Sequence, residues 1–283
     1  MQNHNKVQLA VNSIRERIPL CHQARIGLIL GTGLGRLAGM LTEKKEIPYS
    51  KIAGFPQSTV ESHAGALTYG LLGETPVWTL QGRFHLYEGY NPAQVCMGVR
   101  TLAGLGATTL VITNAAGGLN PLWPAGSLML VADHINFTAE NPLAGPNHDA
   151  WGPRFPDMSQ VYTPALQELA LAQALNAGIR LERGIYIGIR GPNLETPAET
   201  RLFRQLGADA IGMSTVLEAI AARHLGMDIL AISCITNRNL PDCMAPVSVQ
   251  EVIQIADRSA EALGTLVYRV VGAMNKASQG LTP

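Results

Sequence analysis

The chain has 283 residues, of which 47% are hydrophobic and 15% charged, so it carries enough apolar side chains for a large core. Lysine plus arginine number 21, and aspartate plus glutamate also number 21, which gives no electrostatic case for nucleic acid or an anionic membrane as partner. No apolar run approaches membrane-spanning length, and the first residues lack the apolar block of a signal peptide. We therefore expect a cytoplasmic protein.

The four cysteines give no sign of a metal site or a disulfide framework. Cys21, Cys96, Cys234 and Cys243 are scattered without CxxC or other metal-ligand spacing. Reduced thiols fit this pattern and a cytosolic location. We expect no bound metal.

Short apolar runs alternate with amphipathic stretches along the whole chain, which indicates a sheet flanked by helices. The runs are almost entirely apolar, as is typical of strands covered on both faces. With no convincing linker or repeat, residues 1–283 are expected to form a single α/β domain. In chain order, the predicted strands are 26–30, 76–80, 109–112, 128–131, 185–189 and 229–232.

Helix starts are marked by capping boxes, in which a Ser or Thr is followed three residues later by Glu. Thr196 opens one such box, with proline at the first helical position, and Thr215 and Ser248 open two more. Asn91 begins a close variant. The box at Ser248 predicts a long terminal helix over about 249–274. Residues 121–156 are rich in Pro, Gly, Asn and Asp, so we expect a substantial irregular segment there with a functional role.

Polar and glycine-rich segments follow several predicted strands directly. They cover residues 31–35, 114–118, 191–195 and 236–237. In open α/β sheets, ligands bind outside the carboxyl ends of the strands. We expect these segments to converge on one site.

Residues 82–90 form the most informative segment, because Arg83, His85 and Tyr87 stand between glycines directly behind the strand at 76–80. A planar guanidinium beside an imidazole suits the binding of an oxyanion, and glycine lets the backbone approach it closely. Taken singly, Arg83 would be interpreted as a surface arginine and His85 as a core histidine. Together they favour a phosphate site, to which Thr32 and Ser214 could add hydroxyl and backbone donors.

Two further residues suit the recognition of a heterocycle. Glu195 precedes the capping Thr196, so it either complements the helix dipole or accepts hydrogen bonds from a pair of ligand N–H groups. Asn237 ends an apolar strand, where an amide needs a partner, and it can both donate and accept.

Taken together and in this order, these segments resemble the trimeric, low-molecular-mass purine nucleoside phosphorylases of the nucleoside phosphorylase superfamily. The resemblance implies a single domain with a central mixed, twisted, partly barrel-like β-sheet flanked by helices, and a homotrimer. The matching segments, written as residue numbers, are 31–35, 62–65, 82–90, 114–119, 154–156, 191–195, 212–215 and 235–237.

The resemblance also implies a reaction, in which a purine nucleoside and inorganic phosphate give a free purine and ribose 1-phosphate, as in purine salvage. Phosphate is then a co-substrate, and no cofactor or metal is needed. The catalytic residues would be Asn237, Glu195 and His85. Implied phosphate ligands are Thr32, His63, Arg83, His85, Ala115 and Ser214. Implied ribose contacts are Tyr87, Met213 and the Phe155 of a neighbouring subunit. Implied purine contacts are Glu195, Asn237, Thr236, Leu194, Ala116 and Gly117.

Two positions depart from the family pattern. Leu194 stands where the family usually has an aromatic residue, and Val249 stands where it has a histidine that binds the ribose 5′-hydroxyl. The amide of Asn237 favours 6-oxopurines, namely inosine, guanosine and xanthosine, whereas an aspartate would favour a 6-amino group. Two alternatives stay open: a 5′-methylthio-nucleoside phosphorylase, which Val249 suggests, and a non-catalytic purine-binding module, which the set of Arg83, His85 and Ser214 disfavours.

Overall fold

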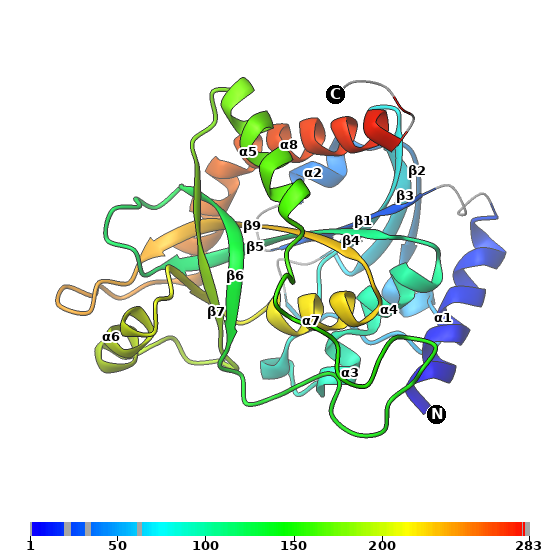
Figure 1. The fold of residues 1–283 in the computed structure, drawn as a ribbon, viewed down its shortest axis with the longest axis horizontal. Coiled ribbons are helices and arrows are strands. Elements are labelled where there is room, and N and C mark those ends of the chain that lie inside the picture. Colours follow the sequence, from blue (N-terminus) through cyan, green and yellow to red (C-terminus); the bar gives the residue numbers. More distant parts are fainter. Residues whose placement is uncertain (1, 20–23, 32–34, 61–63, 279, 281–283) are drawn as a thin grey trace.

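A mixed β-sheet runs through the middle of the molecule, with helices on both of its faces (Figure 1). The computed structural model describes residues 2–19, 24–31, 35–60, 64–278 and 280. The strands are β1 (Ile26–Leu30), β2 (Thr42–Pro48), β3 (Ala66–Leu72), β4 (Thr75–Gln81), β5 (Thr109–Gly118), β6 (Leu128–Asn136), β7 (Leu181–Gly188), β8 (Ala210–Gly212) and β9 (Asp228–Arg238).

All of these strands belong to one sheet, in the order β2-β3-β4-β1-β5-β8-β7-β6-β9. Because β5 also pairs with β9, the strands β5, β8, β7, β6 and β9 close into a ring. The first half of β5 pairs with β1, whereas its last residues, Gly117 and Gly118, pair with β8. The sheet therefore forks at the middle of β5, and the predicted mixed, partly barrel-like fold is confirmed.

The predicted strands are all present, but several extend well beyond their apolar runs. β1 has the predicted bounds, whereas β5 continues to Gly118 and β9 to Arg238. Residues 114–118 and 236–237 therefore belong to β5 and β9 themselves, and do not form segments that follow these strands. Closure of the ring gives these polar and glycine-rich residues backbone partners, which the hydrophobic pattern alone does not reveal. β6 occupies part of the segment 121–156, whose remainder is irregular.

The helix starts agree with the capping boxes. Thr196 Oγ1 accepts from the backbone N–H of Glu199 at 3.2 Å, and the Glu199 carboxylate accepts from the Thr196 N–H at 2.8 Å. The box at Ser248 opens the terminal helix, which continues past the predicted end to Ser278. The helices are α1 (Gln2–Arg17), α2 (Arg36–Gly39), α3 (Pro92–Val95), α4 (Met97–Gly104), α5 (Pro164–Asn176), α6 (Pro197–Gln205), α7 (Val216–His224) and α8 (Val249–Ser278), with short 3₁₀ turns η2 (Tyr49–Lys51) and η3 (Leu86–Glu88).

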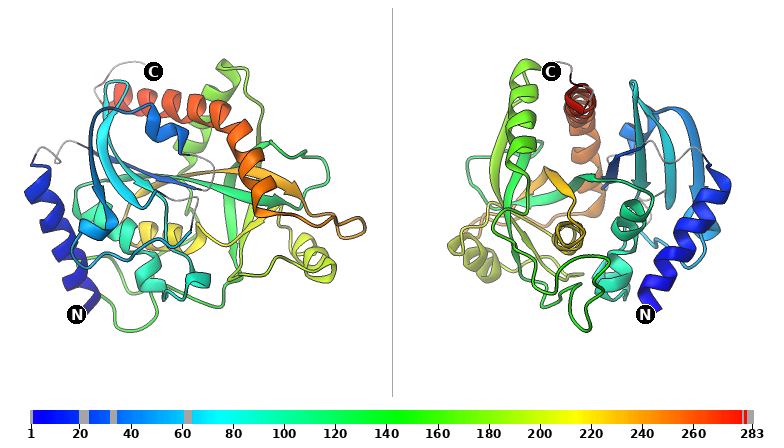
Figure 2. Two further views of the ribbon diagram at one scale, coloured as in Figure 1. Left: turned by 180° about the vertical axis from the view of Figure 1, so that it is seen from behind. Right: turned by 45° about the vertical axis from the view of Figure 1, so that its right-hand side comes forward.

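The two largest hydrophobic cores lie on opposite faces of the sheet, and this explains the continuously apolar strands. In β1, Ile29 joins one core, whereas Ile26, Leu28 and Leu30 join the other. The first core is completed by side chains of α1, α4 and α7, and the second by side chains of α2, α5 and α8. In Figure 2, α8 runs along one face of the sheet and α7 lies on the other.

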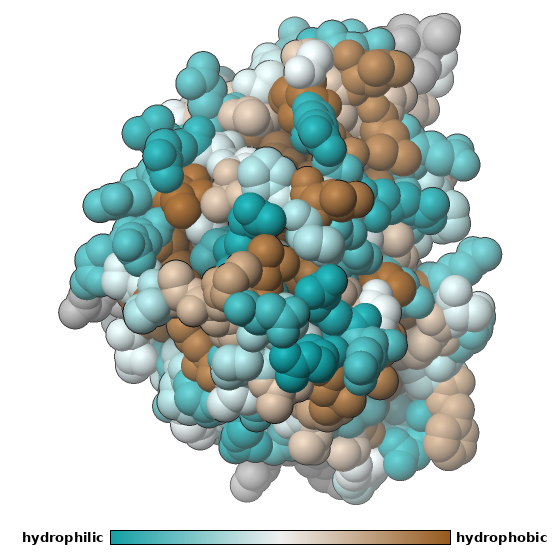
Figure 3. All heavy atoms as spheres, turned by 90° about the vertical axis from the view of Figure 1, so that its left-hand side faces the viewer, coloured by the Kyte–Doolittle hydropathy of each residue, from teal (hydrophilic) through white to brown (hydrophobic). Residues whose placement is uncertain are grey.

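Exposed apolar side chains gather in small groups rather than in one large patch on the face shown in Figure 3. Large hydrophobic residues that reach the surface include Leu194 before α6, Leu202 within it and Leu206 directly after it. Of the described helices, none is long and apolar enough to cross a membrane. Cys96 and Cys234 are buried and Cys243 is exposed, all as free thiols.

Candidate active site

The carboxyl ends of several parallel strands meet at one edge of the sheet. β1 runs parallel to both β4 and β5, and β5 runs parallel to β9. Thr113 Oγ1 donates to the Ile29 carbonyl at 3.0 Å and accepts from the Gly31 N–H at 3.4 Å, which ties the end of β1 to β5. A side chain at position 31 would begin 2.9 Å from Asn114 Cα, so glycine is required there by this close approach.

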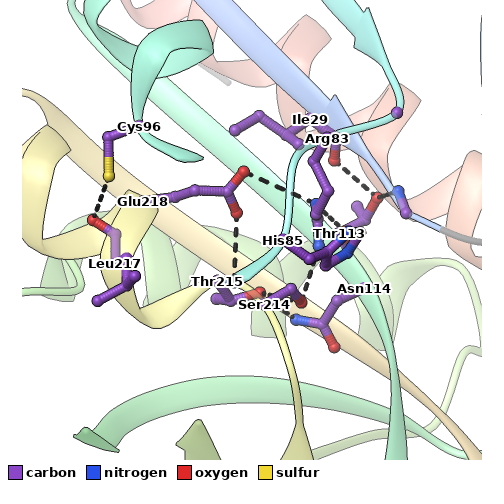
Figure 4. Close-up of polar contacts among 12 residues, drawn as sticks. Ile29, Arg83, His85, Cys96, Thr113, Asn114, Ser214, Thr215, Leu217 and Glu218 are labelled. Carbon is purple, nitrogen blue, oxygen red and sulfur yellow. Dashed lines mark hydrogen bonds and ion pairs between the residues drawn. The ribbon is translucent and has the colours of Figure 1, made fainter. Parts of the chain in front are cut away.

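Arg83 is the centre of one polar cluster at this edge. Its guanidinium donates through Nη1 to Ser214 Oγ at 2.9 Å and through Nη2 to the Thr113 carbonyl at 2.6 Å (Figure 4). Its Nε lies 3.7 Å from the carboxylate of Glu218, and Arg83 is only 3% exposed. Arg83 and Ser214 are 131 positions apart in the sequence, so the fold brings together the end of β4 and the start of α7.

The turn before α7 holds Ser214 in place through a strained residue. Thr215 has φ 70° and ψ −51°, an unusual conformation for a β-branched residue, and the Val216 N–H donates across it to the Ser214 carbonyl at 2.7 Å. Asn114 Nδ2 donates to Thr215 Oγ1 at 2.9 Å, and Glu218 accepts from the Thr215 N–H at 3.2 Å. These bonds stabilise the strained turn, which directs the Ser214 hydroxyl at Arg83.

His85 is fixed by a carboxylate three residues further on. Both its backbone N–H and its ring Nδ1 lie 2.8 Å from the same oxygen, Oε1, of Glu88. The other oxygen accepts from Thr59 N–H at 2.9 Å and from Thr59 Oγ1 at 2.6 Å. Although burial acts in the opposite direction, the hydrogen bonds from His85 and Thr59 lower the pKa of Glu88 to about 2.

The His85 ring itself is neutral near pH 7. Burial lowers its pKa, and this effect outweighs the contribution of Glu88, which acts to raise it. The ring of Tyr87 stacks on the imidazole, with centroids 4.6 Å apart and planes 16° from parallel. Burial also raises the pKa of Tyr87 to about 12, so its hydroxyl remains protonated.

A second polar cluster contains the predicted base-binding residues. Asn237 Nδ2 donates to Asn239 Oδ1 at 2.6 Å, and Asn239 Nδ2 donates to Glu195 Oε2 at 2.8 Å. The Thr236 hydroxyl lies 3.2 Å from Asn237 Oδ1 and 3.2 Å from the Ala116 carbonyl, and these two acceptors share its single hydrogen. Burial raises the pKa of Glu195, an effect that the bond from Asn239 partly offsets.

A β-bulge at Thr236 orients Asn237. Along the β5–β9 ladder, Ala116 pairs with Ile235, but the next pair is Gly117 with Asn237, so Thr236 is an extra residue in β9. Without the bulge, Asn237 would pair with Gly118. Because side chains alternate along a strand, Asn237 would then face the opposite side of the sheet.

The loop that carries Glu195 packs against the segment that carries Ser214. A Cβ at Gly191, where φ is +70°, would lie 2.3 Å from the sulfur of Met213. The glycine therefore allows both the turn and this contact. Met213 is half-buried beside Ser214, and Ala115 is half-buried on β5 next to Asn114.

Other predicted residues lie at the surface or outside the described part of the chain. Leu194 is 54% exposed, Val249 at the start of α8 is 68% exposed, and Phe155 is 86% exposed. The Phe155 ring contacts the guanidinium of Arg154, 5.4 Å from the ring centre. Thr32 and His63 fall outside the described residues.

Several residues of the two clusters were not identified from the sequence. Glu218 was read only as part of a capping box, and its second role beside Arg83 follows from the fold. Glu88 has a local signal, because an acid three residues after His85 can reach its ring. Asn239, Thr113 and Tyr186, whose hydroxyl lies 3.5 Å from Ser214 Oγ, have no signal in the sequence. Within the described ranges, no three His, Cys, Asp or Glu side chains are grouped to hold a metal ion.

Comparison with known proteins identifies the family. Residues 25–272 match the model of the phosphorylase superfamily. The chain is 46% identical to purine nucleoside phosphorylase 1 of Geobacillus stearothermophilus, covering 97% of this chain and 99% of the relative. It is 44% identical to the Bos taurus purine nucleoside phosphorylase, covering 88% and 89%.

Solved structures agree with this result. A Schistosoma mansoni purine nucleoside phosphorylase, isoform 2, in complex with cytosine and ribose-1-phosphate, superposes with a TM-score of 0.89 at 36% identity, covering 94% of this chain and 95% of that one. A schistosoma purine nucleoside phosphorylase in complex with hypoxanthine gives a TM-score of 0.88 at 35% identity, with 94% and 96% covered. This chain therefore belongs to the phosphorylase superfamily, among the purine nucleoside phosphorylases.

Proposed function

We propose that this protein uses phosphate to cleave 6-oxopurine nucleosides into a free purine and (deoxy)ribose 1-phosphate, as part of purine salvage. The substrates would be inosine and guanosine, and also xanthosine, which presents the same base edge. The observation that carries this proposal is that two polar clusters lie at the carboxyl ends of the strands. One contains the buried Arg83 guanidinium and the Ser214 hydroxyl, and the other contains the Glu195 carboxylate and the Asn237 amide. Schistosoma relatives have been solved with hypoxanthine and with adenosine, which supports a purine as the base, and the preference for a 6-oxopurine rests on the amide of Asn237.

Phosphate would bind at the Arg83 cluster. The Arg83 guanidinium and the Ser214 hydroxyl are already 2.9 Å apart, and an oxyanion accepting from both gains charge-assisted hydrogen bonds in a largely buried environment. The backbone of Ala115 would add a donor, and Thr32 and His63 would complete the set. Arg83 keeps its position because the Thr113 carbonyl and Glu218 hold its other side.

His85 would act on the protonation state of phosphate. Because Nδ1 faces the ionised Glu88 at 2.8 Å, the neutral ring carries its hydrogen on Nδ1 and its lone pair on Nε2. Nε2 would then accept the hydrogen of monohydrogen phosphate. This keeps the attacking oxygens anionic and directed at the sugar.

Cleavage of the glycosidic bond places positive charge on the ribose and negative charge on the departing base. Phosphate fixed beneath the sugar stabilises the cation and then attacks it. Tyr87 and Met213 would line the ribose. Asn237 would donate to the N7 and O6 side of the purine, and Glu195 would accept from N1–H, which stabilises the charge on the base. Thr236, Leu194, Ala116 and Gly117 would surround the ring.

A homotrimer in the cytoplasm belongs to this proposal. Phe155 is 86% exposed, so it is available to cover the ribose of a neighbouring subunit. The reaction as proposed needs no cofactor, since phosphate is a co-substrate.

A second candidate is a preference for 5′-methylthio nucleosides. Val249 supports it, because an apolar side chain cannot hydrogen-bond a 5′-hydroxyl. The amide at Asn237 supports the first candidate, and it acts on the base itself rather than on the 5′ end.

The wild-type protein tests the proposal directly. We expect phosphate-dependent release of hypoxanthine from inosine, with a kcat/KM at least tenfold above that for adenosine, measured by chromatography of the released base. A similar or larger kcat/KM for methylthioinosine than for inosine would favour the second candidate. If no base is released on adding phosphate, the chain is a non-catalytic binding module.

Arg83→Lys should raise the phosphate KM about tenfold or more, because lysine keeps the charge beside Glu218 but loses the two-pronged guanidinium. The inosine KM should change less than twofold. Steady-state kinetics with each substrate varied in turn measure both, and Arg180→Lys, at a side chain that is 77% exposed, is the control. An effect confined to the inosine KM would reject the phosphate assignment.

Asn237→Asp should move the preference from inosine toward adenosine, since a donor facing O6 becomes an acceptor that suits a 6-amino group. We expect the inosine-to-adenosine ratio of kcat/KM to fall about tenfold or more. Asn193→Asp adds the same charge at a nearby exposed position and should leave the ratio unchanged. An unaltered ratio in Asn237→Asp would contradict the role of this amide.

Glu88→Gln should lower the pKa of His85 further. Burial is the largest influence on that pKa and lowers it, as the charge of Arg83 does; Glu88 acts to raise it, and its loss leaves only the smaller effect of Glu218 in that direction. NMR of the His85 ring nitrogens against pH measures the shift, with Glu74→Gln as an exposed control.

The same variant predicts a change in acid stability. The lowered pKa of Glu88 means that wild type gains stability from its ionised form above about pH 4.5 and loses it as the pH falls toward about 2. Glu88→Gln should lack this part of the pH dependence.

In the NMR experiment, a His85 pKa that stays the same or rises in the variant would show that Glu88 does not control the ring.

A further inference from the structure

Asn239 lies between the two residues that are assigned to grip the base. Its carboxamide accepts from Asn237 Nδ2 at 2.6 Å and donates to Glu195 Oε2 at 2.8 Å. Asn239 is 6% exposed and Glu195 is 8% exposed, so these hydrogen bonds are largely shielded from water. The Asn239 side chain is therefore either a third, fixed contact for the bound base or a group that fills the volume the base must enter.

The direction of each hydrogen bond in this cluster follows from the carboxylate. Ionised Glu195 can only accept, so the Asn239 side chain must present its NH₂ group to Glu195 and its carbonyl to Asn237. Asn237 must then direct its own NH₂ group at Asn239, which leaves its oxygen for the Thr236 hydroxyl at 3.2 Å. The pattern is a donor at Asn237 and an acceptor at Glu195, with a carboxamide between them.

The Asn239 carboxamide has the chemical pattern of a 6-oxopurine edge. A primary amide offers O=C–N–H with oxygen and hydrogen on the same side, and the lactam formed by C6, O6 and N1–H of hypoxanthine or guanine offers the same group. In both cases the oxygen accepts from Asn237 and the N–H donates to Glu195. Adenine has the reverse pattern, with a donor at the 6-amino group and an acceptor at N1.

The carboxamide also rests on the strand surface assigned to the base. A Cβ at Gly117 would lie 2.8 Å from Asn239 Nδ2 and 3.5 Å from Asn237 Nδ2, so the two amides cover the glycine where β5 and β9 pair. Gly117 is one of the residues assigned to the purine. The side chain and the lactam edge of a bound purine would therefore compete for one volume.

We propose that Asn239 is an internal stand-in for the lactam of a 6-oxopurine, which satisfies Glu195 and Asn237 in the empty enzyme and swings away when the base enters. This inference rests on the proposed function, because it takes the base to lie between these two residues. The stand-in avoids leaving a carboxylate and an amide buried without partners. It also weakens the binding of every base by the same factor, because each base must break the two bonds, and this favours release of the free purine.

Asn239→Ala tests the inference by removing the competitor. The expected result is that hypoxanthine and guanine each bind about fivefold tighter, with equal factors, because water is the only group left to displace. Isothermal titration calorimetry with the free bases measures the dissociation constants without any turnover. Asn193→Ala removes an exposed amide near Glu195 and should leave both constants unchanged.

A second variant separates loss of the bonds from loss of the fold. Asn239→Val keeps apolar bulk at Cβ but cannot reach either partner, and it should tighten base binding in the same direction. Both variants keep the backbone N–H of residue 239, which donates to the Gly118 carbonyl at 2.8 Å. Circular dichroism and the unfolding temperature report whether the fold is intact.

The outcomes are distinct. Weaker binding in folded Asn239→Ala and Asn239→Val would make Asn239 a fixed contact and overturn the inference, and so would unchanged binding. Absence of inosine phosphorolysis in the wild type would instead reject the proposed function. A crystal structure of wild type with hypoxanthine provides a direct check, since the inference requires Asn239 to lie more than hydrogen-bond distance from Glu195.

Discussion

The buried contact between Arg83 and Glu218 is the interaction on which the site depends. A guanidinium that is 3% exposed needs a counter-charge, and Glu218 supplies it from the first turn of α7. Removing one partner of a buried ion pair costs about 3–5 kcal/mol, because the other charge is left uncompensated. The same carboxylate accepts from the N–H of the strained Thr215. One side chain thus holds both the arginine and the turn that presents Ser214.

The closed ring of strands determines the position of the second cluster. β7 and β9 are not neighbours in the sheet, yet the loop after β7 brings Glu195 to Asn239, which follows β9. The ring makes this possible because β8 links β7 to β5, and β5 pairs with β9. The bulge at Thr236 then turns Asn237 to the side where Gly117 leaves room.

The sequence predicts the parts of the molecule that depend on local signals. The capping boxes at Thr196 and Ser248 and the apolar run of β1 correspond to the observed elements. Arg83 and His85 were chosen from one segment, and the structure brings Arg83 to Ser214, a residue chosen separately. The caps and the strand cores share a cause, since both are set by neighbouring residues, whereas the contact between Arg83 and Ser214 joins two locally chosen residues that only the fold brings together.

What the sequence does not predict depends on contacts between distant segments. The extensions of β5 and β9 follow from ring closure, and the bulge at Thr236 is invisible in an uninterrupted strand-like run. The bridge formed by Asn239 requires the register of β9 against β5 to be known to one residue. Likewise, the contact between Glu218 and Arg83 joins α7 to the end of β4. In the sequence, Glu218 shows only its local role in a helix cap and not its role as the counter-charge of Arg83.

A crystal structure of the protein with phosphate and inosine, or with phosphate and hypoxanthine, would test the central claim most directly. The account predicts the anion within hydrogen-bond distance of the Arg83 guanidinium and Ser214 Oγ, with the purine edge between Glu195 and Asn237. An anion bound away from Arg83, or a purine that contacts neither Glu195 nor Asn237, would contradict it.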